Sequence, residues 1–592
     1  MKVLMTGNEA VARGAYEAGV MVASAYPGTP STEIMENFSK YEGVYAEWAP
    51  NEKVAAEVAM GAAVRGVRSF ASMKHVGLNV AADPFMSFAY HGSNGGFVII
   101  TADEPNMFSS QNEQDNRLYS IHAKVVCIEP SDSQECINFM KIAFEISEKF
   151  NTTVLFRLTT RVCHSKTPVE LNERIVPKTE TFIKNPKKYV MVPAHSRAKH
   201  PEIEENLLKL REFSNTTILN REEIHDTKIG IICNGVSYLY AREVMGDKAS
   251  YLKIGMSNPL PIEKIKSFAK KVDKLYIIEE NEPFMETQIK SWGIECTGKD
   301  LFPICGEFSP ELIREKLLGV KPEIAFTAEN EPPLRPPVLC AGCPHRGLYF
   351  ELGKYKKKAF FSGDIGCYTL GYLPPFEAMD ISIDMGASIT VAQGYQRANE
   401  KADDDNSNLK PFALIGDSTF FHSGVTGLLN MTYNHTPITV IILDNSITAM
   451  TGHQDNPGTG VSAMGNMSQK VDIETLCLAC GVKENNIVVV DPYDLDATKE
   501  AVKRGYEATE PFVIITRREC ALLKPVQQER VDMKCKVDYD KCRFCKICIN
   551  TGCPALQIDH ENEKIFIDTV QCNGCTICMQ VCPFDAIEKA GE

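Results

Sequence analysis

Short apolar runs alternate with amphipathic stretches along the first 190 residues. The runs GFVIITAD (96–103), KVVCIEP (124–130) and TTVLFRLTT (152–160) have the length and composition of buried strands. Strands that alternate with helical stretches are typical of βαβ units. The pattern therefore predicts a parallel sheet with helices between its strands.

Two further blocks of the same kind follow. A charged helical stretch at about 185–227 leads into the second block, and the proline-rich ENEPPLRPPV (329–338) favours a linker before the third. Strands are expected in the second block at 228–235, 251–256 and 274–280, and in the third at 358–367, 412–417, 438–445 and 511–520. We predict four domains, at 1–190, 191–330, 331–528 and 529–592.

Composition and charge narrow the class of protein. The 592 residues are 44% hydrophobic and 24% charged, as in ordinary globular domains, and the formal net charge is −14. This charge argues against a nucleic-acid-binding surface. The longest apolar runs, such as ITVIIL (438–443), are far shorter than the ~20 residues that span a bilayer. We expect a cytoplasmic protein that binds neither nucleic acid nor a membrane.

Eight of the 21 cysteines form two closely spaced runs near the C-terminus. The first run is C-x2-C-x2-C-x4-C-P and the second is C-x2-C-x2-C-x3-C-P. In a cytosolic protein such spacing indicates metal or cluster ligands rather than disulfides. Zinc is the competing occupant. Scattered cysteines in apolar surroundings, among them Cys127, Cys136, Cys233 and Cys477, are expected to be buried free thiols.

Oxygen-bearing side chains follow two predicted strands of the third block. Asp417 and Ser418 end the strand of FALIGDSTFFHSG (412–424), and Asp444 and Asn445 end ITVIILDN (438–445). Ligands bind at the carboxyl ends of strands in open α/β sheets, and hard oxygen ligands suit a Mg²⁺ ion that bridges a diphosphate. Two ordinary turns are the simpler alternative, because these are also turn residues.

The pair of segments resembles the GDG-x(25–30)-NN signature of thiamine diphosphate enzymes. That resemblance implies thiamine diphosphate and Mg²⁺ as cofactors, held around Gly416, Asp417 and Ser418, with Ser418 in place of a glycine. It further implies that Asp417 and Asn445 bind the metal through their side chains and Ile447 through its carbonyl.

The first block carries the other elements expected of such an enzyme. PNEKVAAEVAMGAAVRG (50–66) resembles the helix that supplies a carboxylate to the aminopyrimidine ring, which implies that Glu52 has this role. Glu57 lies further along, and an exposed helix carboxylate is the alternative for either residue. SAYPGTPSTE (24–33) resembles the YPITPS loop of 2-oxoacid:ferredoxin oxidoreductases, which implies that Thr29 contacts the 2-oxoacid. SSQNEQDNR (109–117) resembles another loop of that family, without an assigned role.

The two cysteine runs resemble a bacterial two-cluster ferredoxin. In that arrangement the fourth cysteine of each run serves the other cluster. One [4Fe–4S] cluster would then be held by Cys542, Cys545, Cys548 and Cys582, and the other by Cys572, Cys575, Cys578 and Cys553. The x4 spacing therefore alters the ligand loop of the second cluster, and we hypothesise that it changes the geometry or potential of that cluster or makes one iron labile.

Four more cysteines suggest a third cluster. LCAGCPHRG (339–347), GDIGCYTLG (363–371) and RRECAL (518–523) supply Cys340, Cys343, Cys367 and Cys520. Their layout resembles the proximal [4Fe–4S] site of the same enzyme family. The alternative is that these are core thiols and a structural C-x2-C.

The chain as a whole resembles the large (alpha) subunits of the indolepyruvate:ferredoxin oxidoreductases. This implies two thiamine-diphosphate-type parallel α/β domains, an intervening transketolase C-terminal-like α/β domain and a two-cluster ferredoxin-like α+β domain. The implied reaction is aryl 2-oxoacid + CoA + oxidised ferredoxin → aryl-acetyl-CoA + CO₂ + reduced ferredoxin.

The resemblance also implies partners. No fourth α/β block is evident for the gamma-type domain of the superfamily, so a smaller beta subunit is expected to supply it, in an α2β2 assembly. Three alternatives remain open: the same reaction on a branched-chain or pyruvate-like 2-oxoacid, a non-oxidative thiamine diphosphate decarboxylase or synthase, and an electron-relay subunit without catalysis.

Overall fold

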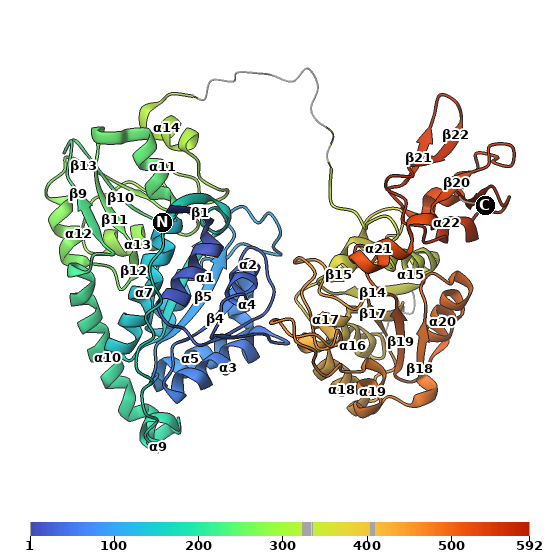
Figure 1. The fold of residues 1–592 in the computed structure, drawn as a ribbon, viewed down its shortest axis with the longest axis horizontal. Coiled ribbons are helices and arrows are strands. Elements are labelled where there is room, and N and C mark those ends of the chain that lie inside the picture. Colours follow the sequence, from blue (N-terminus) through green and yellow to red (C-terminus); the bar gives the residue numbers. More distant parts are fainter. Residues whose placement is uncertain (1, 322–332, 334, 403–408, 591–592) are drawn as a thin grey trace. The chain divides into compact units, whose positions relative to one another are not determined.

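The computed structural model describes residues 2–321, 333, 335–402 and 409–590 (Figure 1), so much of the predicted linker at 329–338 lies outside the described residues. The chain divides into two compact units. The first holds residues 1–329 together with 463–465, and the second holds the remaining residues from 330 onward. Each unit has its own sheets and apolar cores.

The main sheet of the first unit has seven strands in the order β12-β6-β7-β5-β4-β2-β3. Neighbouring strands are parallel except β12 and β6. The bounds are β2 (Val22–Ala25), β3 (Tyr45–Trp48), β4 (Ser69–Lys74), β5 (Phe97–Asp103), β6 (Val126–Ile128), β7 (Val154–Thr159) and β12 (Met256–Asn258). The three strands predicted in this block are confirmed as β5, β6 and β7.

Helices cover both faces of this sheet. Successive strand residues point to opposite sides, so each strand contributes to two cores. On β5, Val98 and Ile100 belong to a core with α1 (Gly7–Glu17), α2 (Thr32–Phe38) and α7 (Ser133–Phe150). Ile99, between them, belongs to a core with α3 (Glu52–Arg65), α4 (His75–Val80) and α5 (Ala82–His91). The predicted parallel α/β class is therefore confirmed for this block.

A smaller sheet of four strands, in the order β13-β10-β11-β9, completes the first unit. Its strands are β9 (Arg221–Glu223), β10 (Ile229–Asn234), β11 (Ser250–Ile254) and β13 (Lys274–Ile278), and its helices are α11 (Gly235–Met245), α12 (Ile262–Ala269), α13 (Phe284–Ser291) and α14 (Pro310–Leu318). The charged stretch at 185–227 contains the long helix α10 (Pro193–Thr216), which Figure 1 shows along the side of the unit. The boundary placed at residue 190 stays a prediction.

Buried ion pairs join the two blocks of the first unit. Arg117, at the end of the loop 109–117, is fully buried and pairs with Asp115 and with Glu279 beyond β13, the latter at 2.7 Å. Charges buried this deeply must be paired, because leaving one unpaired costs several kcal/mol. The loop 109–117 therefore helps to hold the two blocks of the first unit together.

The second unit is built on a six-stranded parallel sheet in the order β15-β14-β16-β17-β19-β18. Four of its strands confirm those predicted, and the set is β14 (Ala359–Gly363), β15 (Ile381–Ser382), β16 (Lys410–Gly416), β17 (Thr439–Asp444), β18 (Ile487–Val490) and β19 (Phe512–Arg517). Cores form on both faces: one with α15 (His345–Leu352) and α20 (Leu495–Glu507), the other with α16 (Ala387–Asn399), α18 (Val425–Tyr433) and α19 (Ile473–Ala479).

The cysteine-rich tail forms two small antiparallel ribbons. Strand β20 (Cys535–Val537) pairs with β23 (Ile587–Lys589), and β21 (Leu556–Asp559) pairs with β22 (Lys564–Ile567). The tail packs on the rest of the second unit through α22 (Ile577–Gln580), where the backbone N–H of Leu495 donates to Gln580 at 3.1 Å.

All 21 cysteines are free thiols, and Cys127, Cys136, Cys233 and Cys477 are buried as predicted. Within the described residues, no helix combines the length and apolarity needed to cross a bilayer. The cytoplasmic location stays a prediction.

Candidate functional site

Three oxygen-bearing groups meet at the carboxyl ends of β16 and β17. In the orientation that satisfies its neighbours, the Asn445 amide N–H donates to Oδ1 of Asp417 at 3.2 Å and to the carbonyl oxygen of Ile447 at 2.8 Å. With the amide turned over, its oxygen would take the place of the nitrogen beside the other two oxygens. Neighbouring ligands of an octahedral Mg²⁺ ion are separated by about 3 Å, so this set of three oxygens fits a magnesium ion.

The surroundings of Asp417 also favour a cation. The side chain is buried, and burial together with the nearby Asp444 raises the pKa of Asp417 to about 7. Asp444 is already paired with Arg517 at 2.8 Å, whereas Asp417 receives an amide N–H from Asn456 at 3.3 Å. A bound Mg²⁺ would hold Asp417 as the carboxylate.

The residues on either side of Asp417 pack closely against their neighbours. A Cβ at Gly416 would lie 2.5 Å from the ring of Tyr368, so a side chain would not fit there. The hydroxyl of Thr448 donates to Ser418 at 2.9 Å. Ser418 thus fills the place of the signature's glycine with a hydrogen-bonded hydroxyl.

A cavity of 220 Å³ lies beside this oxygen set, with Asn445 in its wall. All four cysteines of the predicted third cluster line it: Cys340, Cys343, Cys367 and Cys520. His345 and His453 line it as well. His345 is buried, which lowers its pKa to about 4, so its imidazole is neutral at pH 7. The Nε2 atom of His453 lies 3.7 Å from Sγ of Cys520.

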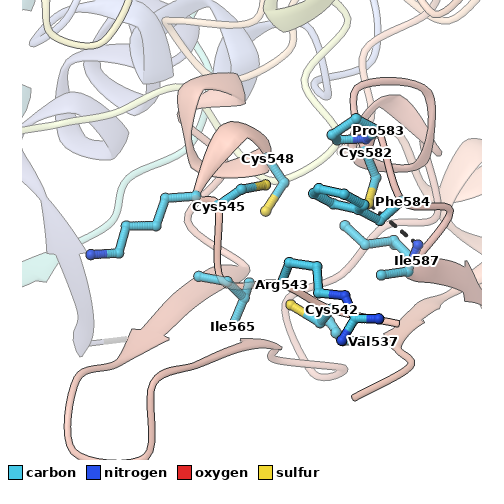
Figure 2. Close-up of a pocket in the computed structure, with 12 residues that line it drawn as sticks. Val537, Cys542, Arg543, Cys545, Cys548, Ile565, Cys582, Pro583, Phe584 and Ile587 are labelled. Atoms are coloured by element: carbon cyan, nitrogen blue, oxygen red, sulfur yellow. Dashed lines mark hydrogen bonds between the residues drawn. The ribbon is translucent and has the colours of Figure 1, made fainter. Parts of the chain in front are cut away.

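The structure also brings Cys542, Cys545 and Cys548 of the first run together with Cys582 of the second. These four thiols line one small cavity of 20 Å³, and Figure 2 shows them beside Arg543 and Ile565.

Cys572 and Cys578 of the second run lie in one apolar cluster of the tail with Cys553. Burial raises the pKa of Cys575 to about 12, and the nearby thiols of Cys553, Cys535 and Cys572 contribute through their charges. Within the described residues, no three His, Cys, Asp or Glu side chains converge as ligands of a single metal ion would. A [4Fe–4S] cluster needs a different arrangement, since each of its thiolates binds a different iron.

In the first unit, Glu52 and Glu57 have different surroundings. Glu52 begins α3 and is only 5% exposed, and a Cβ at Gly77 would lie 2.6 Å from its Oε1. Glu57 is exposed and pairs with Lys53. Of these two carboxylates, Glu52 is therefore the buried one.

Thr29 lies in a loop at the carboxyl end of β2. Hydrogen bonds within the loop hold it closed: the Gly28 N–H donates to Thr32 at 3.0 Å, and the Ser31 hydroxyl donates to the Gly28 carbonyl at 2.9 Å. Thr29 itself is half-buried. The loop 109–117 reaches the same end of the sheet, where His75, at the start of α4, contacts the carbonyl of Asn112 at 3.1 Å.

Sequence reasoning missed three residues around these sites: Asn456, Arg346 and Cys535. Asn456 reaches Asp417 from a loop that gave no periodic pattern. Arg346 is buried and donates to carbonyls of both the 339–343 loop and the tail. Cys535 lies outside both cysteine runs, and only its position before the first run could have drawn attention to it.

Family models match three parts of the chain. Residues 13–226 match the model described as pyruvate flavodoxin/ferredoxin oxidoreductase, thiamine diphosphate-binding, and residues 364–516 match the C-terminal thiamine pyrophosphate-binding domain of thiamine pyrophosphate enzymes. Residues 565–588 match a 4Fe-4S binding domain.

Curated relatives match the whole chain. An indolepyruvate oxidoreductase subunit IorA of Thermococcus kodakarensis is 43% identical over 100% of this chain and 98% of its own, and one of Archaeoglobus fulgidus is 40% identical with the same coverage. A 2-oxoglutarate synthase subunit KorA of Methanothermobacter thermautotrophicus is 25% identical over 48% of this chain and 89% of its own.

Proposed function

The chain belongs to the family of indolepyruvate oxidoreductase IorA subunits, and from this premise we propose that it catalyses the oxidative decarboxylation of indolepyruvate and related aryl 2-oxoacids, with CoA as acyl acceptor and ferredoxin as electron acceptor. One observation carries the proposal. Asn445 belongs both to the oxygen set that fits Mg²⁺ and to the wall of the cavity lined by four cysteines. The cofactor's metal and the first electron acceptor would thus be neighbours.

Thiamine diphosphate, when bound, supplies a carbanion that adds to the 2-oxo carbon and an electron sink for the decarboxylation. The side chains of Asp417 and Asn445 and the carbonyl of Ile447 would hold the Mg²⁺ that bridges the diphosphate. Glu52 would hold a proton at the aminopyrimidine ring. Its side chain is buried against Gly77 of α4, which keeps water from competing for that proton. Thr29 would contact the 2-oxoacid.

The four cavity cysteines would hold a proximal [4Fe–4S] cluster, and the eight tail cysteines would hold two more in the crossed pairing described above. Hydrogen bonds suggest the order of electron transfer. Asn573, next to Cys572, donates to the carbonyl of Ala521, next to Cys520, at 3.1 Å. Electrons would therefore pass from the cavity to the second run's cluster, and from there to the cluster that contains Cys545.

Two of the alternatives have lost support. A non-oxidative decarboxylase passes no electrons to an acceptor, so it would not need the 4Fe-4S domain that the tail matches. An electron relay without catalysis has no use for an oxygen set that fits Mg²⁺. The related reaction on other 2-oxoacids stays an alternative that the assay below decides.

We also propose that a smaller beta subunit completes the enzyme as an α2β2 assembly. The relatives are named as subunits of an oxidoreductase, which supports a partner chain.

The substrate proposal is tested on the chain co-expressed with its genomic neighbour and purified without oxygen. Viologen reduction is measured with indolepyruvate, phenylpyruvate, pyruvate and 2-oxoisovalerate, each with and without CoA. We expect CoA-dependent turnover that is fastest with the two aryl substrates. No aryl-dependent rate would contradict the proposal, and a preference for 2-oxoisovalerate or pyruvate would assign the alternative substrate class.

The proximal cluster is tested by iron content. Three [4Fe–4S] clusters correspond to about twelve iron atoms per chain and two to about eight. We expect Cys367→Ala to lower the iron content from about twelve to about eight, while Cys477→Ala, which removes a buried thiol elsewhere in the unit, leaves it unchanged. Equal iron in both variants would contradict the third cluster.

A further inference from the structure

The tail contains two copies of one local pattern. KCKVDYDKC (534–542) and KIFIDTVQC (564–572) place a strand at the same distance before the first cysteine of each run. The turn between them is also the same: the N–H of Cys542 donates to the Asp538 carbonyl at 3.0 Å, and that of Cys572 donates to the Asp568 carbonyl at 2.9 Å. The two copies therefore serve as internal controls for each other.

The copies differ at one buried position beside the clusters. In the second copy this position is Ile565, which is 1% exposed and lines the cavity of the first cluster (Figure 2). An aliphatic side chain there excludes water from the cluster and offers no ligand.

In the first copy the same position is Cys535, also 1% exposed. Its backbone N–H donates to Sγ of Cys572 at 3.5 Å. Its side chain packs in one apolar cluster with those of Cys572 and Cys578. The second cluster site therefore has five thiols, where the first has four and an isoleucine.

We propose that Cys535 is an alternative ligand of the second cluster, able to take the iron that Cys572 holds. The inference rests on the ligand sets proposed above. In the exchange, the thiol proton of Cys535 passes to the Cys572 sulfur, one iron–sulfur bond breaks and one forms, and no electron moves. The backbone N–H of Cys535 already contacts the Cys572 sulfur and both side chains pack in one cluster, which places Cys535 next to the ligand that it would replace. The plainer role of Cys535, a small apolar filler of the core, predicts no exchange.

Matched variants in the two copies separate these roles. Each is made in the full chain with its partner subunit and purified without oxygen, and iron content and EPR spectra are measured. We expect Cys542→Ala to lose the first cluster or convert it to a three-iron form, because Ile565 cannot replace the ligand. Cys572→Ala should keep all of its iron, and Cys572→Ala/Cys535→Ala should lose iron as Cys542→Ala does. Cys542→Ala/Ile565→Cys should regain it.

The outcomes distinguish the inference from its premise. Equal iron loss in Cys572→Ala and in the Cys572→Ala/Cys535→Ala double variant would overturn the inference and leave the ligand sets intact. Full iron in Cys542→Ala would overturn the ligand assignment and the inference with it. The EPR signal of the untouched cluster reports whether the tail has folded.

A further variant keeps all eight cysteines of the two ligand sets and changes only Cys535. Cys535→Ile copies the second half of the tail and should fold with its full iron content. It should then release iron from the second cluster to a chelator in air faster than the unmodified chain, with Ile565→Val as the matched control. An unchanged release rate would overturn the inference.

Discussion

Glu52 and Glu57 stand on one helix, yet only one of them is buried. The change Glu52→Gln keeps the shape of the side chain and removes its charge. Because general acid–base groups contribute about 10²- to 10⁴-fold, we expect a loss of kcat in that range with thiamine diphosphate still bound. Glu57→Gln, at an exposed carboxylate paired with Lys53, should change kcat less than about twofold. Steady-state viologen reduction and cofactor titration measure both variants, and equal losses would contradict the role of Glu52.

A second residue, Glu280, makes the stability of the first unit depend on pH. Burial raises its pKa to about 7; the charge of Glu307 adds to the shift, and Arg157 and Lys299 oppose it. A carboxyl whose pKa is higher in the folded state binds its proton more tightly there. It therefore lowers the free energy of unfolding progressively as pH rises from about 4.5 to about 7, by up to about 3 kcal/mol.

The variant Glu280→Gln should remove this dependence, because a glutamine can still accept the N–H of Phe308 that Glu280 accepts at 2.9 Å. We expect its gain in stability over the unmodified chain to be small at pH 5 and largest at pH 8, by chemical denaturation of the first unit. Glu243→Gln, on the exposed side of α11, serves as the control. A gain that does not grow with pH would show that Glu280 is not the titrating group.

At the scale of elements, Arg346 joins α15 to the tail. Its guanidinium donates to the carbonyls of Leu339 and Cys340 in one loop and of Thr551 and Gly552 in the other. The second loop is the one with the x4 spacing before Cys553. The extra residue therefore lies in the loop whose carbonyls dock on Arg346, which gives the spacing a structural role besides its hypothesised effect on the cluster.

The variant Arg346→Lys keeps the charge but loses the planar fork, so some of these carbonyls lose their partner. A buried carbonyl without a partner costs about 1–3 kcal/mol. We expect amide hydrogen exchange in residues 548–553 to rise about 10- to 100-fold. Arg504→Lys, at an exposed arginine of α20, is the matched control. Unchanged exchange in Arg346→Lys would show that the tail docks through other contacts.

The elements also show what the sequence could predict. Strands rich in Val and Ile, such as β17 and β19, had an unmistakable apolar run. Strands β2 and β4, VASA and SFASMK, were missed because small and polar residues interrupt their apolar pattern. The antiparallel strand β12 was missed since its partner β6 lies in another block.

The residues of the candidate site likewise divide into those that local sequence predicts and those that it does not. Asp417 and Asn445 could be predicted because each ends a recognisable strand. Asn456 reaches the site only through the path of a long loop, and Cys535 could not be told from a core thiol until its neighbours were known. Contacts of this kind depend on the tertiary fold rather than on local spacing.

At the scale of the whole molecule, electrons must leave a protein of net charge −14. The segment KCRFCK (541–546) nevertheless carries three basic residues around the proposed first cluster, and Cys545 is exposed beside Arg543 and Lys546. Opposite charges steer protein partners to each other and raise the association rate 10-fold or more. Electrons would thus leave at a basic rim, formed by these residues, that attracts an acidic ferredoxin.

Charge reversal at this rim should separate the two kinds of acceptor. We expect Arg543→Glu/Lys546→Glu to lower kcat/KM for ferredoxin about 10-fold at low salt, with a smaller effect as salt screens the charges. Viologen, a small molecule that needs no docking surface, should be reduced at the unmodified rate. Lys499→Glu/Lys503→Glu, at two exposed lysines of α20, controls for the change in net charge. Equal losses with ferredoxin and viologen would mean that the variant damages the cluster itself, and an unchanged kcat/KM for ferredoxin would mean that the exit lies elsewhere.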